Sequence, residues 1–173
     1  MEAFLYGLSI FLGLVSGVVV TLCVDLIKEK IGFKKEVENL RFEVQCNIAK
    51  LEKWLKDVED LMNKINSDRV MEFSGYFNLS LTIYSTSIRM FQSGSLYRCL
   101  SKENIEKLQE VGNYLTIAGE NLLNSQINAF KQSAMNGCFD KTSASRYVDT
   151  WRTALLKCEA NYEAILKELQ GKK

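Results

Sequence analysis

The stretch AFLYGLSIFLGLVSGVVVTLCV, residues 3–24, carries no charged side chain. A helix of this length spans roughly 33 Å, which matches the hydrocarbon core of a bilayer. A cleaved signal peptide is the alternative, but it requires Lys or Arg before the apolar run, where only Met1 and Glu2 stand. The lipoprotein variant requires a small residue before the acylated cysteine, and Leu22 precedes Cys23. Residues 1–27 are therefore predicted to form a retained transmembrane helix.

The charges that flank this segment predict its orientation. No Lys or Arg precedes it, whereas four lysines follow it closely: Lys28, Lys30, Lys34 and Lys35. Positive residues are retained on the cytoplasmic side, so the N-terminus is expected outside and residues 28–173 in the cytoplasm. The five cysteines form no C-x-x-C pair, which is typical of reduced thiols rather than of a disulfide framework. We expect a single-pass membrane protein.

Small side chains recur every four residues along the membrane segment: Ser9, Gly13, Gly17 and Thr21. Gly13 and Gly17 form a G-x-x-x-G motif, and Ser16 widens the same small surface. Such surfaces let helices approach closely in lipid, where association depends on packing. We expect a homo-oligomer larger than a dimer, in which Asp25 would form a ring of carboxylates near the cytoplasmic mouth. The alternative is an inert anchor that packs against nothing in particular.

Residues 28–173 have the length of one compact domain and contain no proline, the strongest helix breaker. Their 22 basic and 19 acidic residues leave no strong charge that would indicate nucleic-acid binding. Apolar residues at spacings of three and four predict helices over residues 37–65, 69–92, 101–136 and 142–171. The predicted fold is all-α: the transmembrane helix followed by a cytosolic four-helix bundle.

Two of these helices are less plainly specified than the others. Residues 69–92 also alternate in part like a strand, and their length and the lack of a strand partner favour a helix. The predicted core positions of this stretch are Val70, Phe73, Phe77, Leu81, Tyr84, Ile88 and Phe91. Those of residues 101–136 are Ile105, Leu108, Val111, Leu115, Ala118, Leu122, Ile127 and Phe130. Gly94 and Gly137 are expected to end helices and Ser101 to begin one, while Gly112 and Gly119 suggest a close helix crossing.

The absence of histidine limits the chemistry of this chain. It removes Ser-His and Cys-His nucleophilic catalysis, most zinc sites and the usual general base at neutral pH. The sequence contains no phosphate-binding glycine motif, and its carboxylates lack the Glu-x-x-His pattern of di-iron bundles. We therefore predict no enzyme activity, no cofactor and no metal site, and the cysteines and methionines are expected to be core residues.

One motif suggests a family. The last predicted helix contains Arg146-Tyr-Val-Asp-Thr-Trp-Arg152 followed by Thr-Ala-Leu-Leu-Lys157. A chain with one N-terminal membrane helix and a cytosolic helical bundle resembles the small membrane accessory proteins encoded beside RNA-guided RNases in type VI-B CRISPR systems. Those proteins look like a divergent form of the HEPN nuclease fold, which places an Arg-x4–6-His motif near the start of its last long helix. Arg152 and Lys157 have the matching spacing.

The departure from this motif determines what the resemblance implies. Lys157 replaces the histidine, and lysine does not readily act as a base at neutral pH. A structural or interface role is therefore expected for Arg152 and Lys157. The resemblance still implies an oligomeric pore that depolarises the inner membrane and enhances RNA-targeting antiviral defence, with the RNA-guided RNase or its RNA products as the trigger. The alternatives are a membrane-tethered adaptor that recruits a soluble partner and, with less support, a membrane-bound RNase.

Overall fold

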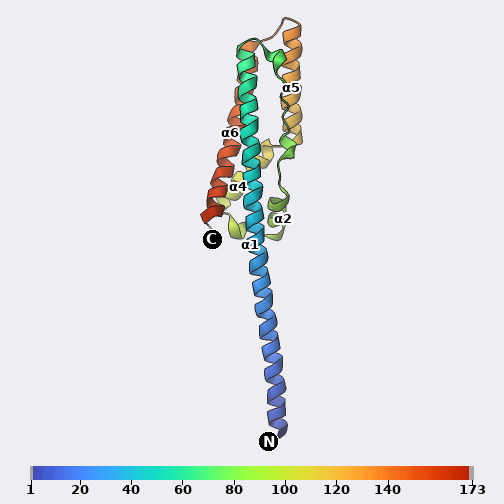
Figure 1. Ribbon diagram of the computed structural model, residues 1–173, viewed down its shortest axis with the longest axis vertical. Coiled ribbons are helices and arrows are strands. Elements are labelled where there is room, and N and C mark those ends of the chain that lie inside the picture. Colours follow the sequence, from blue (N-terminus) through green and yellow to red (C-terminus); the bar gives the residue numbers. More distant parts are fainter. Residues whose placement is uncertain (1, 172–173) are drawn as a thin grey trace. The chain divides into compact units, whose positions relative to one another are not determined.

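The computed structural model describes the backbone of residues 2–171 and the side chains of residues 18–171 (Figure 1). Over that range the chain has six α-helices, two short 3-10 helices and no strand. The α-helices are α1 (Glu2–Asn66), α2 (Ser85–Ser93), α3 (Leu96–Cys99), α4 (Lys102–Tyr114), α5 (Ile117–Met135) and α6 (Lys141–Gly171), and the 3-10 helices are η1 (Val70–Glu72) and η2 (Leu79–Leu81). The prediction of an all-helical bundle is confirmed, but the predicted number of four bundle helices is wrong, because the described residues form six α-helices.

The chain divides into two compact units, Met1–Glu38 and Asn39–Lys173. The first unit is helical, and its side chains are exposed from Val18 to Gly32. Among the residues with described side chains, no helix combines the length and the apolar character needed to cross a membrane. The predicted membrane segment lies outside those residues as far as residue 17, so the transmembrane helix stays a prediction. The predicted division after residue 27 depends on a membrane border and also stays a prediction.

In the second unit, the part of α1 after Glu38 lies antiparallel to α6 (Figure 1). The Arg41 guanidinium donates to the Leu169 carbonyl at 2.7 Å, and the Asn47 amide donates to the Tyr162 hydroxyl at 3.1 Å. Further along, the Ser145 hydroxyl donates to the Asn66 side chain at 3.3 Å. Both helices bury most of the predicted stripe positions, including Leu40, Val44, Leu51, Val58, Ile65, Leu155, Cys158, Tyr162, Ile165 and Leu169. The predicted positions Ile48, Leu55, Met62, Tyr147 and Trp151 are half-buried. These two helices are the best predicted part of the fold.

The single helix predicted over residues 101–136 is wrong, because the chain forms two helices there. α4 ends at Tyr114, and the Thr116 hydroxyl accepts a hydrogen bond from the Gly119 N–H at 3.0 Å, which caps the start of α5. This break shifts the apolar stripe by one residue. Leu123 is therefore buried, and the predicted core residue Leu122 is exposed.

The helix predicted over residues 69–92 is also wrong for most of its length. Residues 67–84, which we call the strap, contain η1 and η2 but no α-helix, and α2 begins at Ser85. Val70, Phe73 and Phe77 are buried as predicted, but Leu79 replaces Leu81 in the core. Leu81, Ile88 and Phe91 are exposed at 61, 54 and 45%. The physical reason is that side chains of neighbouring helices bind the backbone of the strap, as described below.

The predicted helix ends are largely confirmed. Gly94 and Gly137 have φ of 77° and 69°, in the left-handed region that glycine adopts without steric cost. Ser101 caps α4, because its hydroxyl accepts from the Asn104 N–H. A Cβ added at Gly119 would lie 2.9 Å from the Tyr114 carbonyl oxygen and 3.2 Å from the Trp151 ring, so the side chain of Trp151, and not the backbone of α6, approaches α5 there. The close crossing predicted at Gly112 is wrong, since a Cβ there would meet no atom within 4 Å.

Candidate functional site

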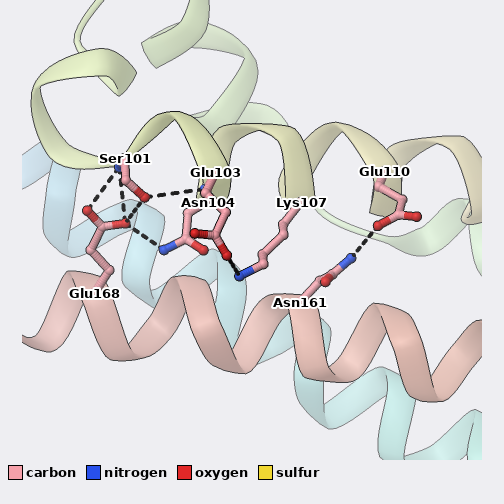
Figure 2. Close-up of polar contacts among 7 residues, drawn as sticks. All are labelled: Ser101, Glu103, Asn104, Lys107, Glu110, Asn161 and Glu168. Carbon is pink, nitrogen blue, oxygen red and sulfur yellow. Dashed lines mark hydrogen bonds and ion pairs between the residues drawn. The ribbon is translucent and has the colours of Figure 1, made fainter.

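The candidate nuclease-like motif lies on α6, where Lys157 faces α4. The Lys157 ammonium pairs with the Glu110 carboxylate. Glu110 also accepts a hydrogen bond from the Asn161 amide at 3.1 Å, and Figure 2 shows this second contact. The hydrogen bond from Lys157 holds the pKa of Glu110 below its ordinary value, and the bond to Glu110 raises the pKa of Lys157. Lys157 thus joins α6 to α4 through an ion pair with Glu110. A lysine held in its charged form by a carboxylate cannot serve as a general base.

Arg152 does not join Lys157 in one site. Five residues separate them on the same helix, which places their side chains about 140° apart around its axis. Arg152 is half-buried, and no ion pair is recorded for it within residues 18–171. The two predicted residues therefore do not converge on a common substrate position. Of the two, Lys157 contributes one ion pair between α4 and α6.

The other end of the contact between α4 and α6 is also polar, as Figure 2 shows. The Glu168 carboxylate accepts from the Ser101 N–H at 2.9 Å, the Ser101 hydroxyl at 3.0 Å and the Asn104 amide at 2.6 Å. Negative charge at a helix N-terminus is favoured by the helix dipole and by the unpaired N–H groups there. Glu168 therefore fastens the start of α4 to the end of α6, and the arrangement is structural.

A second polar site, which the sequence did not reveal, binds the strap. The Asn124 amide of α5 makes a two-way contact with Phe77: it donates to the carbonyl at 2.8 Å and accepts from the N–H at 3.1 Å. Asn47 of α1 binds Ile83 in the same way: it donates to the carbonyl at 2.8 Å and accepts from the N–H at 2.9 Å. Both amides are buried. Each replaces the partners that a neighbouring strand would offer to an extended backbone.

Two buried carboxylates, Glu120 and Glu43, bind further backbone groups in the same way. We call Asn47, Asn124, Glu43 and Glu120 together the amide and carboxylate clamps. Glu120 of α5 accepts from the N–H and the hydroxyl of Ser80 at 2.8 and 2.6 Å. Glu43 of α1 accepts from the N–H groups of Thr86 and Ser87 at 2.7 and 3.1 Å, at the start of α2. Within the described chain, the backbone–backbone hydrogen bonds of the strap join residues at most five apart. Side chains therefore supply its long-range polar contacts.

One feature of the sequence indicates part of the amide and carboxylate clamps. Glu43 and Asn47 lie within the buried face of α1, beside Leu40, Val44 and Leu51. A polar residue is rarely buried unless it has hydrogen-bond partners. Polar side chains spaced by four residues inside an apolar stripe thus indicate a buried polar contact, although they do not identify its partner.

The structure describes the side chains of only some of the residues that are predicted to pack between membrane helices or to line a pore. Ser9, Gly13, Ser16 and Gly17 lie outside the residues with described side chains. Thr21 and Asp25 lie in α1, and both are exposed. The predicted ridge of small side chains and the carboxylate ring therefore stay predictions.

Two of the four cysteines after residue 24, Cys99 and Cys158, are buried, Cys46 is half-buried and Cys138 is exposed. Burial raises the pKa of the Cys158 thiol to about 12, so this group stays protonated and unreactive at neutral pH. We expect iodoacetamide at pH 8 to alkylate Cys138 quickly and Cys158 only after unfolding. Mass spectrometry of digested protein measures both, and rapid alkylation of Cys158 in the native protein would contradict its placement in the core.

Within the part of the chain that the structure describes, no group of three potential metal ligands among His, Cys, Asp and Glu lies together. Comparison with protein-family models, with curated proteins and with solved structures gave no match.

Proposed function

We propose that this chain is a membrane-anchored helical effector that self-associates and forms a pore in a bacterial inner membrane. The observation that carries the proposal is the uncharged segment of residues 3–24 with small residues at Ser9, Gly13, Gly17 and Thr21. A helix that served merely as an anchor would have no need of small residues in this register. The depolarisation, the role in RNA-targeting CRISPR defence and the RNA-guided RNase or its RNA as trigger are parts of this proposal that derive from the resemblance.

The arrangement of α4 and α6 supports a role other than catalysis. Lys157 is engaged by Glu110, and Arg152 lies on a different side of the helix. The clamps likewise use their carboxylates to bind backbone N–H groups. In this proposal the second unit is an assembly or trigger-sensing domain.

A single membrane helix cannot enclose water, because its backbone is hydrogen-bonded internally and its side chains face lipid. Several copies with small, weakly polar faces turned inward can do so. In that arrangement Ser9, Ser16 and Thr21 would supply hydroxyl groups at three depths, and Asp25 would favour cations near the cytoplasmic mouth.

The test replaces residues 3–24 with a polyleucine helix that keeps the protein in the membrane. Expressed with its activating system, the native chain should dissipate the membrane potential, as followed with a potential-sensitive dye, and the polyleucine variant should not. Replacing Gly13 and Gly17 with leucine should weaken the oligomer measured by mass photometry in detergent, because it blocks close backbone approach. Undiminished depolarisation with polyleucine, or a monomer across mild detergents, would refute the pore.

A tethered adaptor is the second candidate, and one observation favours it. Ile88, Phe91 and Tyr97 are exposed on α2 and α3, and the Phe91 and Tyr97 rings lie in contact with centroids 5.8 Å apart. Exposed apolar groups that cluster are typical of protein-binding surfaces. Loss of function on replacing Ile88 and Phe91 with serine, with the polyleucine variant still active, would establish the adaptor instead.

A ribonuclease is the third possibility, and the geometry gives it little support. We expect purified protein to leave single-stranded RNA intact, and Arg152→Ala and Lys157→Ala to change nothing in that assay. Electrophoresis of labelled RNA measures this directly. Cleavage that Arg152→Ala abolishes would show that the motif is catalytic after all.

A further inference from the structure

The charged residues of α1 between Val20 and Glu36 are sorted by face. The apolar residues are not, because Leu22 and Leu26, exposed at 57 and 65%, lie on the opposite side of the helix from the apolar stripe described next. Successive residues of an α-helix are rotated by about 100°, so residues spaced by three and four share one side. Val20, Val24, Ile27 and Ile31 follow steps of four, three and four, and their exposure ranges from 41 to 61%. They form an apolar stripe on the surface of the first unit.

Lysines flank this stripe on both sides. Lys34 lies about 50° to one side of its centre and Lys35 about 50° to the other, with Lys30 and Lys28 further out at about 90° and 70°. All four lysines are exposed. We call the four apolar residues together with these lysines the lysine-flanked face.

The acidic residues of the same segment lie on the opposite side. Asp25, Glu29 and Glu36 are spaced by four and seven residues and share a stripe about 150° from the centre of the lysine-flanked face. Residues 24–36 hold four lysines and three carboxylates, so their net charge is small. The charges are nevertheless separated across the helix, which gives one side of it a positive field.

We propose that the lysine-flanked face contacts the headgroup layer of a bilayer and selects anionic lipids. Lysine stems cover apolar surface while their ammonium groups reach the phosphates, and the stripe between them enters the boundary with the acyl chains. Clustered lysines next to a membrane segment are attracted to anionic headgroups. The opposite acidic stripe is repelled, so the segment leans on the membrane with one defined side. This inference rests on the proposed membrane association and adds the lipid class and the face that binds it.

The test uses the full-length chain in vesicles of phosphatidylcholine, alone or mixed with phosphatidylglycerol, that carry a bromine-labelled lipid as quencher. A tryptophan is introduced by Ile31→Trp on the lysine-flanked face or by Phe33→Trp, about 160° away and about 3 Å along the axis. The signal of Trp54 and Trp151 is subtracted with the parent protein. We expect stronger quenching at position 31 than at position 33, and a difference that grows with the share of anionic lipid.

Two matched variants separate charge from position. Replacing the four lysines with glutamine should reduce the quenching ratio of the two positions to about one, because the attraction to anionic headgroups is lost. Replacing Asp25, Glu29 and Glu36 with their amides should preserve the ratio. Equal quenching at both positions, or a ratio that the lysine variant keeps, would overturn the inference. If the parent protein fails to float with either vesicle, the proposed membrane association fails and this inference with it, whereas flotation with equal quenching refutes the inference alone.

Discussion

Replacing Asn124 with leucine should lower the free energy of unfolding by about 3 kcal/mol, because two buried backbone groups lose their partners. The amide of Asn124 binds both the N–H and the carbonyl of Phe77, and both contacts are buried. Leucine has a similar volume but offers neither a donor nor an acceptor. A loss of this size is a large fraction of the stability of an ordinary domain.

Asn128 offers a matched control one turn further along α5, where its side chain is exposed. Asn128→Leu should change the free energy of unfolding by less than about 0.5 kcal/mol. Urea unfolding of both variants, followed by circular dichroism, measures the difference. Equal stability of the Asn124 and Asn128 variants would mean that the strap does not depend on its amide clamp.

Phe77→Ala should destabilise the protein by about 3–5 kcal/mol, since it removes a large buried side chain and leaves a cavity in the core. Phe77 is fully buried and stacks near Phe73, with ring centroids 6.3 Å apart. The neighbouring Tyr76 is 58% exposed, so Tyr76→Ala should have a small effect.

Thermal and urea unfolding of these two variants test which side of the strap packs into the core. The prediction depends on the close packing of protein interiors, where a removed ring leaves a void. A larger loss from Tyr76→Ala than from Phe77→Ala would show that the strap presents the opposite side to the core.

The helical class and the two long helices could be predicted from sequence because their stripes are long and uninterrupted. The stripe that ends at Ile65 and the one that ends at Leu169 keep a helical period over many turns, and burial follows it. Helix ends were also readable where Ser101, Gly94 and Gly137 supply a local chemical reason. These features depend on neighbours in sequence, so a sequence reveals them.

The strap could not be predicted, because its conformation depends on residues far away in the chain. Phe77 is held by Asn124, 47 residues later, and Ile83 by Asn47, 36 residues earlier. The spacing of its apolar residues fits a helix, but the predicted core residues Leu81, Ile88 and Phe91 are exposed. Tertiary contacts, and not the local spacing of apolar residues, therefore determine the conformation of this segment. At the candidate motif the sequence predicted a structural or interface role for Lys157 but could not identify Glu110 as its partner.

The clamps also determine which changes the strap can tolerate over evolution. Asn47 and Asn124 bind the peptide groups of Ile83 and Phe77 and not their side chains. The exposed side chains of Asn78 and Leu81 between those residues are therefore free to vary, whereas an insertion or deletion there would move one peptide group away from its amide. We expect related sequences to keep the number of residues between positions 77 and 83 while the exposed residues there vary. Surface loops, in contrast, usually tolerate insertions and deletions.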